Sequence, residues 1–211
     1  MSQATGARIR PWTRLLPALC AGVLCVASPA QAQFTQGYKF LEAVKKKDGA
    51  AVEEAIGKPG STVVNARDVT SGQTALHIVT ERRDLTWLRY LVAKGANVNL
   101  ADDRGVTPIQ IATTLDWVDG VKFLVDNGAD LDTSNNTGET PLITAVHRKN
   151  VPVMRALLKG GADPDRADNS GRSARDYAKL SVKSGLLIET IDSYATGKNK
   201  KGGQATYGPT F

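Results

Sequence analysis

The chain has 211 residues, 41% of them hydrophobic and 23% charged, which is typical of a folded protein and excludes a chain that is disordered throughout. Its 27 basic residues exceed its 21 acidic residues, for a formal net charge of +6. Three basic residues precede Gln33 and three follow Ala195, so the body between them is neutral. A neutral body argues against nucleic acid as a partner, because nucleic-acid binding needs a basic face on the folded domain.

The segment at 1–32 has the composition of a secretory signal peptide. Three arginines, the last of them Arg14, precede an apolar run at 15–26, and Ala-Gln-Ala follows at 30–32. This order of a basic, an apolar and a small-residue segment is that of a signal peptide cleaved after Ala32. We therefore expect an exported protein that works in the periplasm or, as the alternative, is secreted.

A membrane anchor is the other interpretation of this segment. The apolar run is shorter than the ~20 residues that a spanning helix needs, and Pro17 interrupts it. No membrane insertion is therefore expected after cleavage. Both cysteines, Cys20 and Cys25, would leave with the signal peptide, so the mature chain would hold neither a disulfide nor a thiolate site.

The remaining sequence repeats itself at one fixed spacing. The four copies read "GQTALHIVT" at 72–80, "GVTPIQIAT" at 105–113, "GETPLITAV" at 138–146 and "GRSARDYAK" at 171–179. A fixed period of this length is the signature of a stacked-repeat protein and outweighs local propensity.

Each copy carries the signals of two short helices. The threonine or serine after the glycine can accept a hydrogen bond from a free backbone N–H, as helix N-caps do, and proline at the next position suits a helix start. A second apolar segment, such as "VPVMRALLKGG" at 151–161, ends at glycine, the residue that best forms a left-handed C-cap. One such pair cannot bury its apolar face alone, so the sequence predicts an all-α solenoid of stacked units. The expected N-caps are Thr74, Thr107, Thr140 and Ser173.

This pattern resembles the ankyrin repeat, whose 33-residue unit opens its first helix with T-P-L-H-x-A. "TALHIV" at 74–79 keeps the histidine, whereas "TPIQIA" at 107–112 and "TPLITA" at 140–145 keep the threonine, proline and alanine. The expected division is a signal peptide at 1–32, a divergent N-terminal capping repeat at 33–67, three full repeats at 68–166, a C-terminal capping repeat at 167–195 and a disordered basic tail at 196–211.

Two departures from the ankyrin pattern carry structural expectations. The glycine that usually separates the two helices is absent, so we expect the neighbouring Asp84 and Asn150 to take the strained backbone conformation. His77 is the only motif histidine, so we expect weaker hydrogen bonding from unit to unit. The residues in place of the separating glycine are Arg83, Asp116 and Lys149.

No catalytic or metal-binding set is visible in the sequence. His77 lies at the motif position, where it is expected to be a buried structural residue, and His147 lies near the end of a first helix. Most aspartates lie in the turns between units, where turn chemistry accounts for them. We therefore expect no enzyme activity, no cofactor and no metal, and keep an enzyme or accessory subunit only as a further alternative.

By resemblance, ankyrin domains bind other proteins through turn tips and the exposed ends of first helices. The resemblance implies a monomeric, non-catalytic adaptor or protective partner of another protein, with a secreted effector that binds a host or competitor-cell protein as the alternative. For any single residue, a solvated charged edge is an equally good interpretation. The candidate binding residues are Gln73, Glu81, Arg82, Arg104, Val106, Thr114, Leu115, Glu139, His147, Arg148 and Arg172.

Overall fold

The computed structural model of the chain describes residues 29–58, 61–182 and 184–195. All but the last four positions of the predicted signal peptide lie outside these residues, as does the whole predicted tail at 196–211. Within them the fold is all-α, as expected, and β-structure is limited to two isolated bridges, Arg67–Thr74 and Ala167–Ser173.

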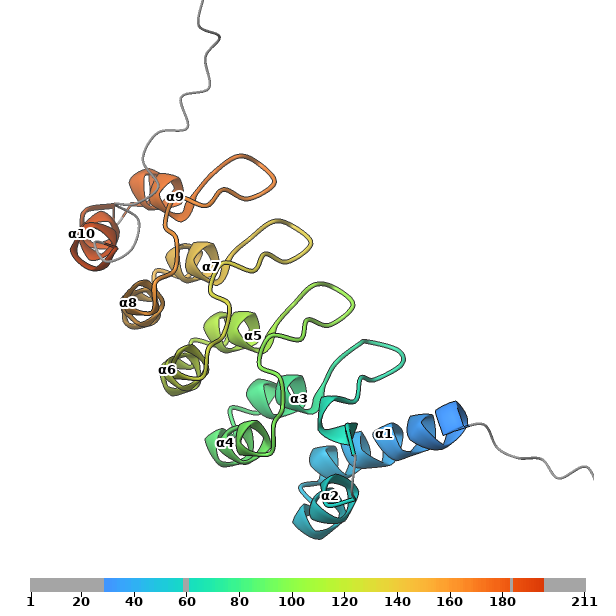
Figure 1. Ribbon diagram of the computed structural model, residues 1–211. Coiled ribbons are helices and arrows are strands. Elements are labelled where there is room, and N and C mark those ends of the chain that lie inside the picture. The colour runs from blue at the N-terminus through green and yellow to red at the C-terminus, as the bar shows by residue number, and fades with distance from the viewer. Residues whose placement is uncertain (1–28, 59–60, 183, 196–211) are drawn as a thin grey trace, which may run out of the picture.

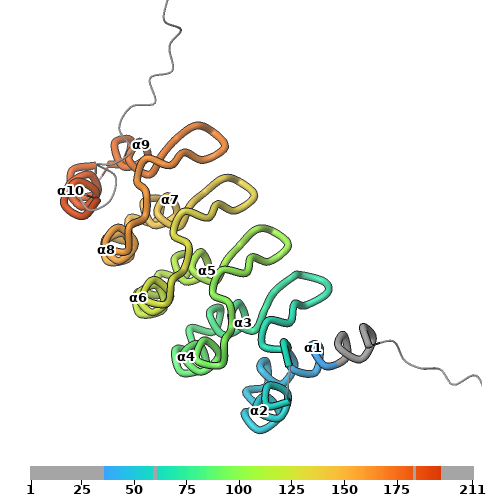
Figure 2. The backbone as a smooth tube through the Cα atoms, viewed as in Figure 1, coloured from blue at the N-terminus to red at the C-terminus, as the bar shows by residue number. Residues whose placement is uncertain are grey.

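Five helix pairs stack side by side in chain order (Figure 1). The first helix of each pair lies in one layer and the second in another, and a long loop projects from the first layer before each of the last four pairs (Figure 2). The first helices are α1 (Pro29–Lys46), α3 (Ala75–Glu81), α5 (Pro108–Thr114), α7 (Pro141–His147) and α9 (Ala174–Leu180). The second helices are α2 (Gly49–Ile56), α4 (Leu85–Ala93), α6 (Val118–Asp126), α8 (Val151–Gly160) and α10 (Ser184–Tyr194), and the short 3-10 helix η1 (Val63–Asn65) follows α2. We call the projecting loops fingers 1 to 4, at 67–73, 100–106, 133–139 and 166–172.

The first helices of the repeating units begin where the sequence predicts. Each follows an N-cap with extended backbone, and Pro108 and Pro141 occupy the first turn of α5 and α7. The Thr140 hydroxyl accepts a hydrogen bond from the backbone N–H of Ile143 at 3.3 Å. All four expected caps hold this position: Thr74, Thr107, Thr140 and Ser173.

The core is one continuous apolar column between the two layers. Leu91, Leu124 and Leu157, one from each middle second helix, are completely buried. Opposite them, Leu76, Ile109 and Leu142 on the first helices are at most 1% exposed. Because every unit adds the same side chains to the column, each unit buries the apolar face of its neighbour. No helix in the described part of the chain is long and apolar enough to cross a membrane.

The turn between the two helices of a unit corrects one expectation. The strained left-handed conformation is not taken by Asp84 or Asn150, which have φ angles of −92° and −90° and instead cap α4 and α8. Their side chains accept from the backbone N–H groups of Trp87 and Val153 at 3.2 and 3.1 Å. An N-cap residue has non-helical backbone with negative φ, so the left-handed conformation is taken by the residue before it. The described non-glycine residues with positive φ are Lys47, Arg83, Asp116 and Lys149, at 59°, 53°, 55° and 56°.

The two ends of the stack differ from its middle. At the N-terminal end, α1 has 18 residues whereas α3 has 7, and Gly37 of α1 lies so close to Ala66 that an added Cβ would be 3.1 Å from the Ala66 Cβ. At the C-terminal end, the position equivalent to Leu142 holds Arg175, which pairs with Asp165 at 2.7 Å and Asp192 at 2.6 Å. This side chain is 25% exposed, because no further described unit covers it.

Polar side chains also link the turns that follow the second helices. The Asn99 side chain accepts from the Asp130 N–H at 2.8 Å and donates to the Gly128 carbonyl at 3.1 Å. One unit later, Asp132 accepts from the Asp163 N–H at 2.8 Å, but a carboxylate has no proton to donate. Burial, together with the negative charges of Asp163 and Asp130, raises the pKa of Asp132.

We predict that Lys149→Gly raises the free energy of unfolding by about 1 kcal/mol, because glycine adopts positive φ without the cost that a side chain brings. Thermal or urea unfolding followed by circular dichroism measures this. Lys122→Gly, on the exposed side of α6, is the matched control and should lower stability by about 1 kcal/mol. Equal destabilisation by both variants would contradict the prediction.

We predict that Asp132→Asn stabilises the protein near pH 7, with a gain that shrinks as the pH falls. A carboxyl whose pKa rises on folding favours the folded state below its unfolded pKa, and this contribution is lost as the pH rises through the folded pKa. Asparagine does not ionise, so the variant does not lose this stability as the pH rises. Melting temperatures between about pH 4 and 8 measure it, and Asp126→Asn, at an exposed position of α6, is the control. A gain in stability that does not depend on pH would show that ionisation of Asp132 is not its cause.

Candidate functional site

Each finger is held in shape by the aspartate or asparagine at its start. Asp102 accepts from the backbone N–H groups of Arg104 and Val106 at 2.9 and 2.8 Å. Burial would raise the pKa of Asp102, but these hydrogen bonds and the Arg104 side chain more than offset it, so its pKa is lowered. In finger 4, hydrogen bonds from the Tyr177 and Ser170 hydroxyls hold the pKa of Asp168 far below its usual value. These aspartates are structural anions, as turn chemistry predicts.

Neighbouring fingers also contact each other. The backbone N–H of Asp103 donates to the Ser71 carbonyl at 3.0 Å, and the Arg67 guanidinium pairs with the Asp103 carboxylate at 3.2 Å. Further along, the Asn169 side chain donates to the Asn136 carbonyl at 3.2 Å. Between these two pairs, Gly105 of finger 2 lies against Asn136 of finger 3, so the fingers form a continuous ridge along the stack.

A buried side chain ties each of two first helices to the next finger. The His77 Nδ1 accepts from the Thr74 N–H at 3.1 Å, which leaves the Nε2 proton to donate to the Val106 carbonyl at 2.9 Å. Burial lowers the pKa of His77 and keeps the ring neutral. The histidine is thus a structural residue, in agreement with the sequence interpretation.

Gln110, at the position equivalent to His77 in the next unit, makes the same link and corrects a second expectation. Its side-chain oxygen accepts from the Thr107 N–H at 3.0 Å, and its amide nitrogen donates to the carbonyls of Glu139 at 3.1 Å and Thr133 at 3.2 Å. The loss of the motif histidine therefore does not weaken this junction, because an amide offers the same acceptor and donor. At the next equivalent position Ile143 is completely buried and apolar, so the expected loss of this hydrogen bond holds at that junction.

The finger bases and the ends of the first helices form one surface. The Gln73 side chain donates to Glu81 at 2.7 Å, and two units further along the equivalent pair, Glu139 and His147, is 3.5 Å apart. We call this the inner surface. Its members are Gln73, Val106, Glu139 and Arg172 at the finger bases, Glu81, Thr114, His147 and Leu180 at the helix ends, and Tyr177.

Of the four remaining candidates, Arg82 and Arg148 serve the fold. The Arg82 guanidinium donates to the carbonyls of Val44 and Lys45 at the end of α1, at 2.8 and 3.1 Å. Arg148 forms a two-pronged ion pair with Asp116 of the preceding unit. Both arginines therefore tie units together. Arg104 pairs with Asp102 inside its own finger at 3.1 Å, and Leu115 is only half-buried.

Tyr177 is not among the candidates from sequence, yet it lies at the centre of the C-terminal part of the inner surface. Its ring is 4.3 Å from the His147 ring in an edge-to-face contact, and its hydroxyl donates to Asp168 at 2.7 Å. The Arg172 guanidinium lies 6.0 Å from the ring centre. The sequence could have indicated Tyr177 only by comparison between units, because the equivalent residues in the other units are isoleucine or threonine.

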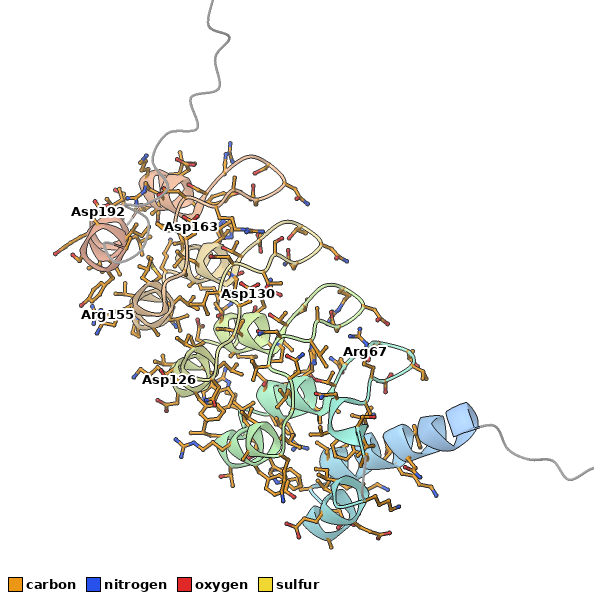
Figure 3. All side chains as sticks on the ribbon, in the orientation of Figure 1. Arg67, Asp126, Asp130, Arg155, Asp163 and Asp192 are labelled. Carbon is orange, nitrogen blue, oxygen red and sulfur yellow. The ribbon has the colours of Figure 1, made fainter. Side chains whose placement is uncertain are left out.

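The opposite side of the stack holds a groove of about 480 Å³ between α6 and α8, lined by side chains that include Val118, Lys122 and Arg155. Figure 3 shows Asp126 and Arg155 in the layer of second helices, away from Arg67 on finger 1. Among the described residues, no three histidine, cysteine or acidic side chains are placed to hold a metal ion.

Comparison with known proteins follows the same units. A family model described as ankyrin repeats (3 copies) matches residues 40–135, and a second, described as ankyrin repeats (many copies), matches residues 124–178. The two matches overlap and together run from α1 to α9. No curated protein matches the chain.

We predict that Gln110→Ala lowers the free energy of unfolding by about 2 kcal/mol, because it leaves the buried Thr107 N–H without its acceptor and removes the hydrogen bonds from the Gln110 amide to the Thr133 and Glu139 carbonyls. Gln110→His, which restores the arrangement of His77, should retain most of the stability. Urea unfolding of both variants tests this. If histidine and alanine were equally destabilising, the hydrogen-bond link would not be the cause.

Proposed function

The chain belongs to the ankyrin-repeat proteins, and from that premise we propose that it is a non-catalytic module whose inner surface binds another protein. A stiff stack of units presents an extended, one-sided surface, which suits contact with a macromolecule. The groups that a partner would meet include Gln73, Thr114 and His147. Gln73 lies on a hydrogen-bonded finger, and Thr114 and His147 lie on helices α5 and α7, so binding needs little further ordering of the backbone.

One observation carries this proposal. Buried positions keep the same type of residue in every full unit, as Leu76, Ile109 and Leu142 do. Inner-surface positions change from unit to unit instead: the finger-base column is Gln, Val, Glu and Arg, and the helix-end column is Glu, Thr, His and Leu. Solubility alone would require only polar side chains at this rigid surface. A mixed series of apolar and charged groups is instead suited to contact with one specific partner.

We also propose that the protein works outside the cytoplasm, after export and cleavage following Ala32. The support is the order of basic, apolar and small residues at 1–32. Cleavage there would remove the first four residues of α1 and leave 33–46, which include the completely buried Phe40 and Val44. The cap of the stack would therefore keep its core residues in the mature protein.

Photo-crosslinking in intact cells that make the protein tests both proposals. We predict that p-benzoylphenylalanine at Thr114, an exposed inner-surface position, gives an adduct with one dominant protein. The matched control is the same group at Lys122, exposed on α6 in the other layer, which should give little of that adduct. Mass spectrometry of the adduct, prepared from periplasm and from culture medium, should show a chain that begins at Gln33.

Equal adducts at both positions, or none at Thr114, would contradict binding through the inner surface. An adduct whose chain still begins at residue 1 and stays in the cytoplasmic fraction would contradict export while leaving protein binding intact. Recovery from the medium would favour the secreted alternative over the periplasm.

A further inference from the structure

Three large apolar side chains are exposed around the turn between α9 and α10. Leu180, Val182 and Leu186 are 69%, 97% and 52% exposed. Scattered exposed apolar residues are ordinary on protein surfaces, but a cluster at one place marks an interaction site. These three residues and the neighbouring Tyr177 and Arg172 define what we call the C-terminal corner.

Comparison with the other units shows that the exposure is specific to this corner. The positions equivalent to Leu180 hold Glu81, Thr114 and His147, and those equivalent to Val182 hold Arg83, Asp116 and Lys149. Thus two positions that are polar in every full unit are apolar here. Leu186 corresponds to Val153, which is completely buried in α8, whereas in the last described helix pair no further unit covers it. Core packing does not account for Leu180 and Val182.

Cationic groups surround the corner on the side of the inner surface. Arg172 is exposed and lies over the Tyr177 ring, and Lys179 has a side chain that is 58% exposed and 3.8 Å from Asp176. The exposed Lys149 occupies the position equivalent to Val182 in the preceding unit. The acidic groups on this side are already bonded: Asp168 accepts from the Tyr177 and Ser170 hydroxyls, and Asp176 accepts from the Ser173 hydroxyl. Acidic Glu189 belongs to α10, in the layer away from the inner surface.

These charges discriminate between the possible occupants. A second copy docked through the same corner would bring the same cations against this rim, and the last residues of this chain carry Lys198, Lys200 and Lys201, so both would be repelled. An acidic segment would be attracted. A bilayer with anionic lipids shares that chemistry, but Leu180 continues the helix-end column of the inner surface, so the corner is an extension of the protein-binding surface.

We propose that the C-terminal corner binds an acidic segment of the partner protein, with a large apolar side chain packed against Leu180 and Val182 and carboxylates paired with Arg172 and Lys179. This inference rests on the protein-binding function proposed above and adds the chemistry of the partner. Arginine over an aromatic ring is a frequent anchor of protein interfaces, and an exposed guanidinium suits a carboxylate well.

Selection of phage-displayed random dodecapeptides on the full chain tests the corner. We expect enriched peptides to carry acidic residues beside leucine, isoleucine or phenylalanine. Their affinity should fall at least about tenfold for the double variant Leu180→Ser, Val182→Ser, as loss of a buried apolar contact predicts. Arg172→Glu should shift the enrichment away from acidic peptides.

Val69→Ser is the matched control, because Val69 is 63% exposed on finger 1, at the other end of the stack, and its loss should leave affinity unchanged. All replaced side chains are exposed, so unchanged melting temperatures should accompany the changes in affinity. Failure to enrich acidic peptides, or enrichment unaffected by the double variant, would overturn the proposal.

Two further measurements separate the other occupants. Co-sedimentation with phosphatidylserine vesicles that is lost in the double variant would assign the corner to a membrane surface. Concentration-dependent self-association with the same loss would assign it to a second copy. If the Thr114 crosslink persists in the double variant while peptide binding there is absent, the protein-binding function stands and only the corner is disproved.

Discussion

Apolar contact between neighbouring helix pairs is the interaction on which the rest of the structure depends. The helices of a pair such as α5 and α6 have 7 and 9 residues, too few to be stable as isolated helices in water. Their apolar side chains are covered only because equivalent positions of the next unit lie against them. Fingers, caps and turn hydrogen bonds then set the spacing at which these apolar faces meet.

Polar links give this contact its register. Apolar burial has no preferred direction. The hydrogen bonds from His77 and Gln110 to the next finger, and those that Asn99 donates to Gly128 and accepts from Asp130, fix how one unit sits on another. The inner surface depends on both. Its side chains stand on the first helices and on fingers that are held by their own aspartate or asparagine, so their spacing follows the spacing of the stack.

The period, the caps and the core column follow from local sequence, because a threonine at an N-cap or a leucine at an inner position acts within its own unit. Other features depend on partners that local patterns do not show. Arg82 and Arg148 have the pattern of exposed anchors, yet their acceptors lie in the preceding unit. Gln110 does not match a histidine motif, although an amide presents the same donor and acceptor. The left-handed residue lies one position earlier than predicted, because the next residue must cap the second helix.

Arg175 and its two carboxylates have a consequence for how this molecule assembles. A chain built from self-similar layers invites the end of one molecule to stack on the beginning of another, and a head-to-tail contact of that kind has no natural stop. At the open C-terminal end, such growth would have to bury the Arg175 guanidinium with Asp165 and Asp192, at a desolvation cost of several kcal/mol. One charged residue in place of leucine thus opposes fibre growth through this end of the described stack.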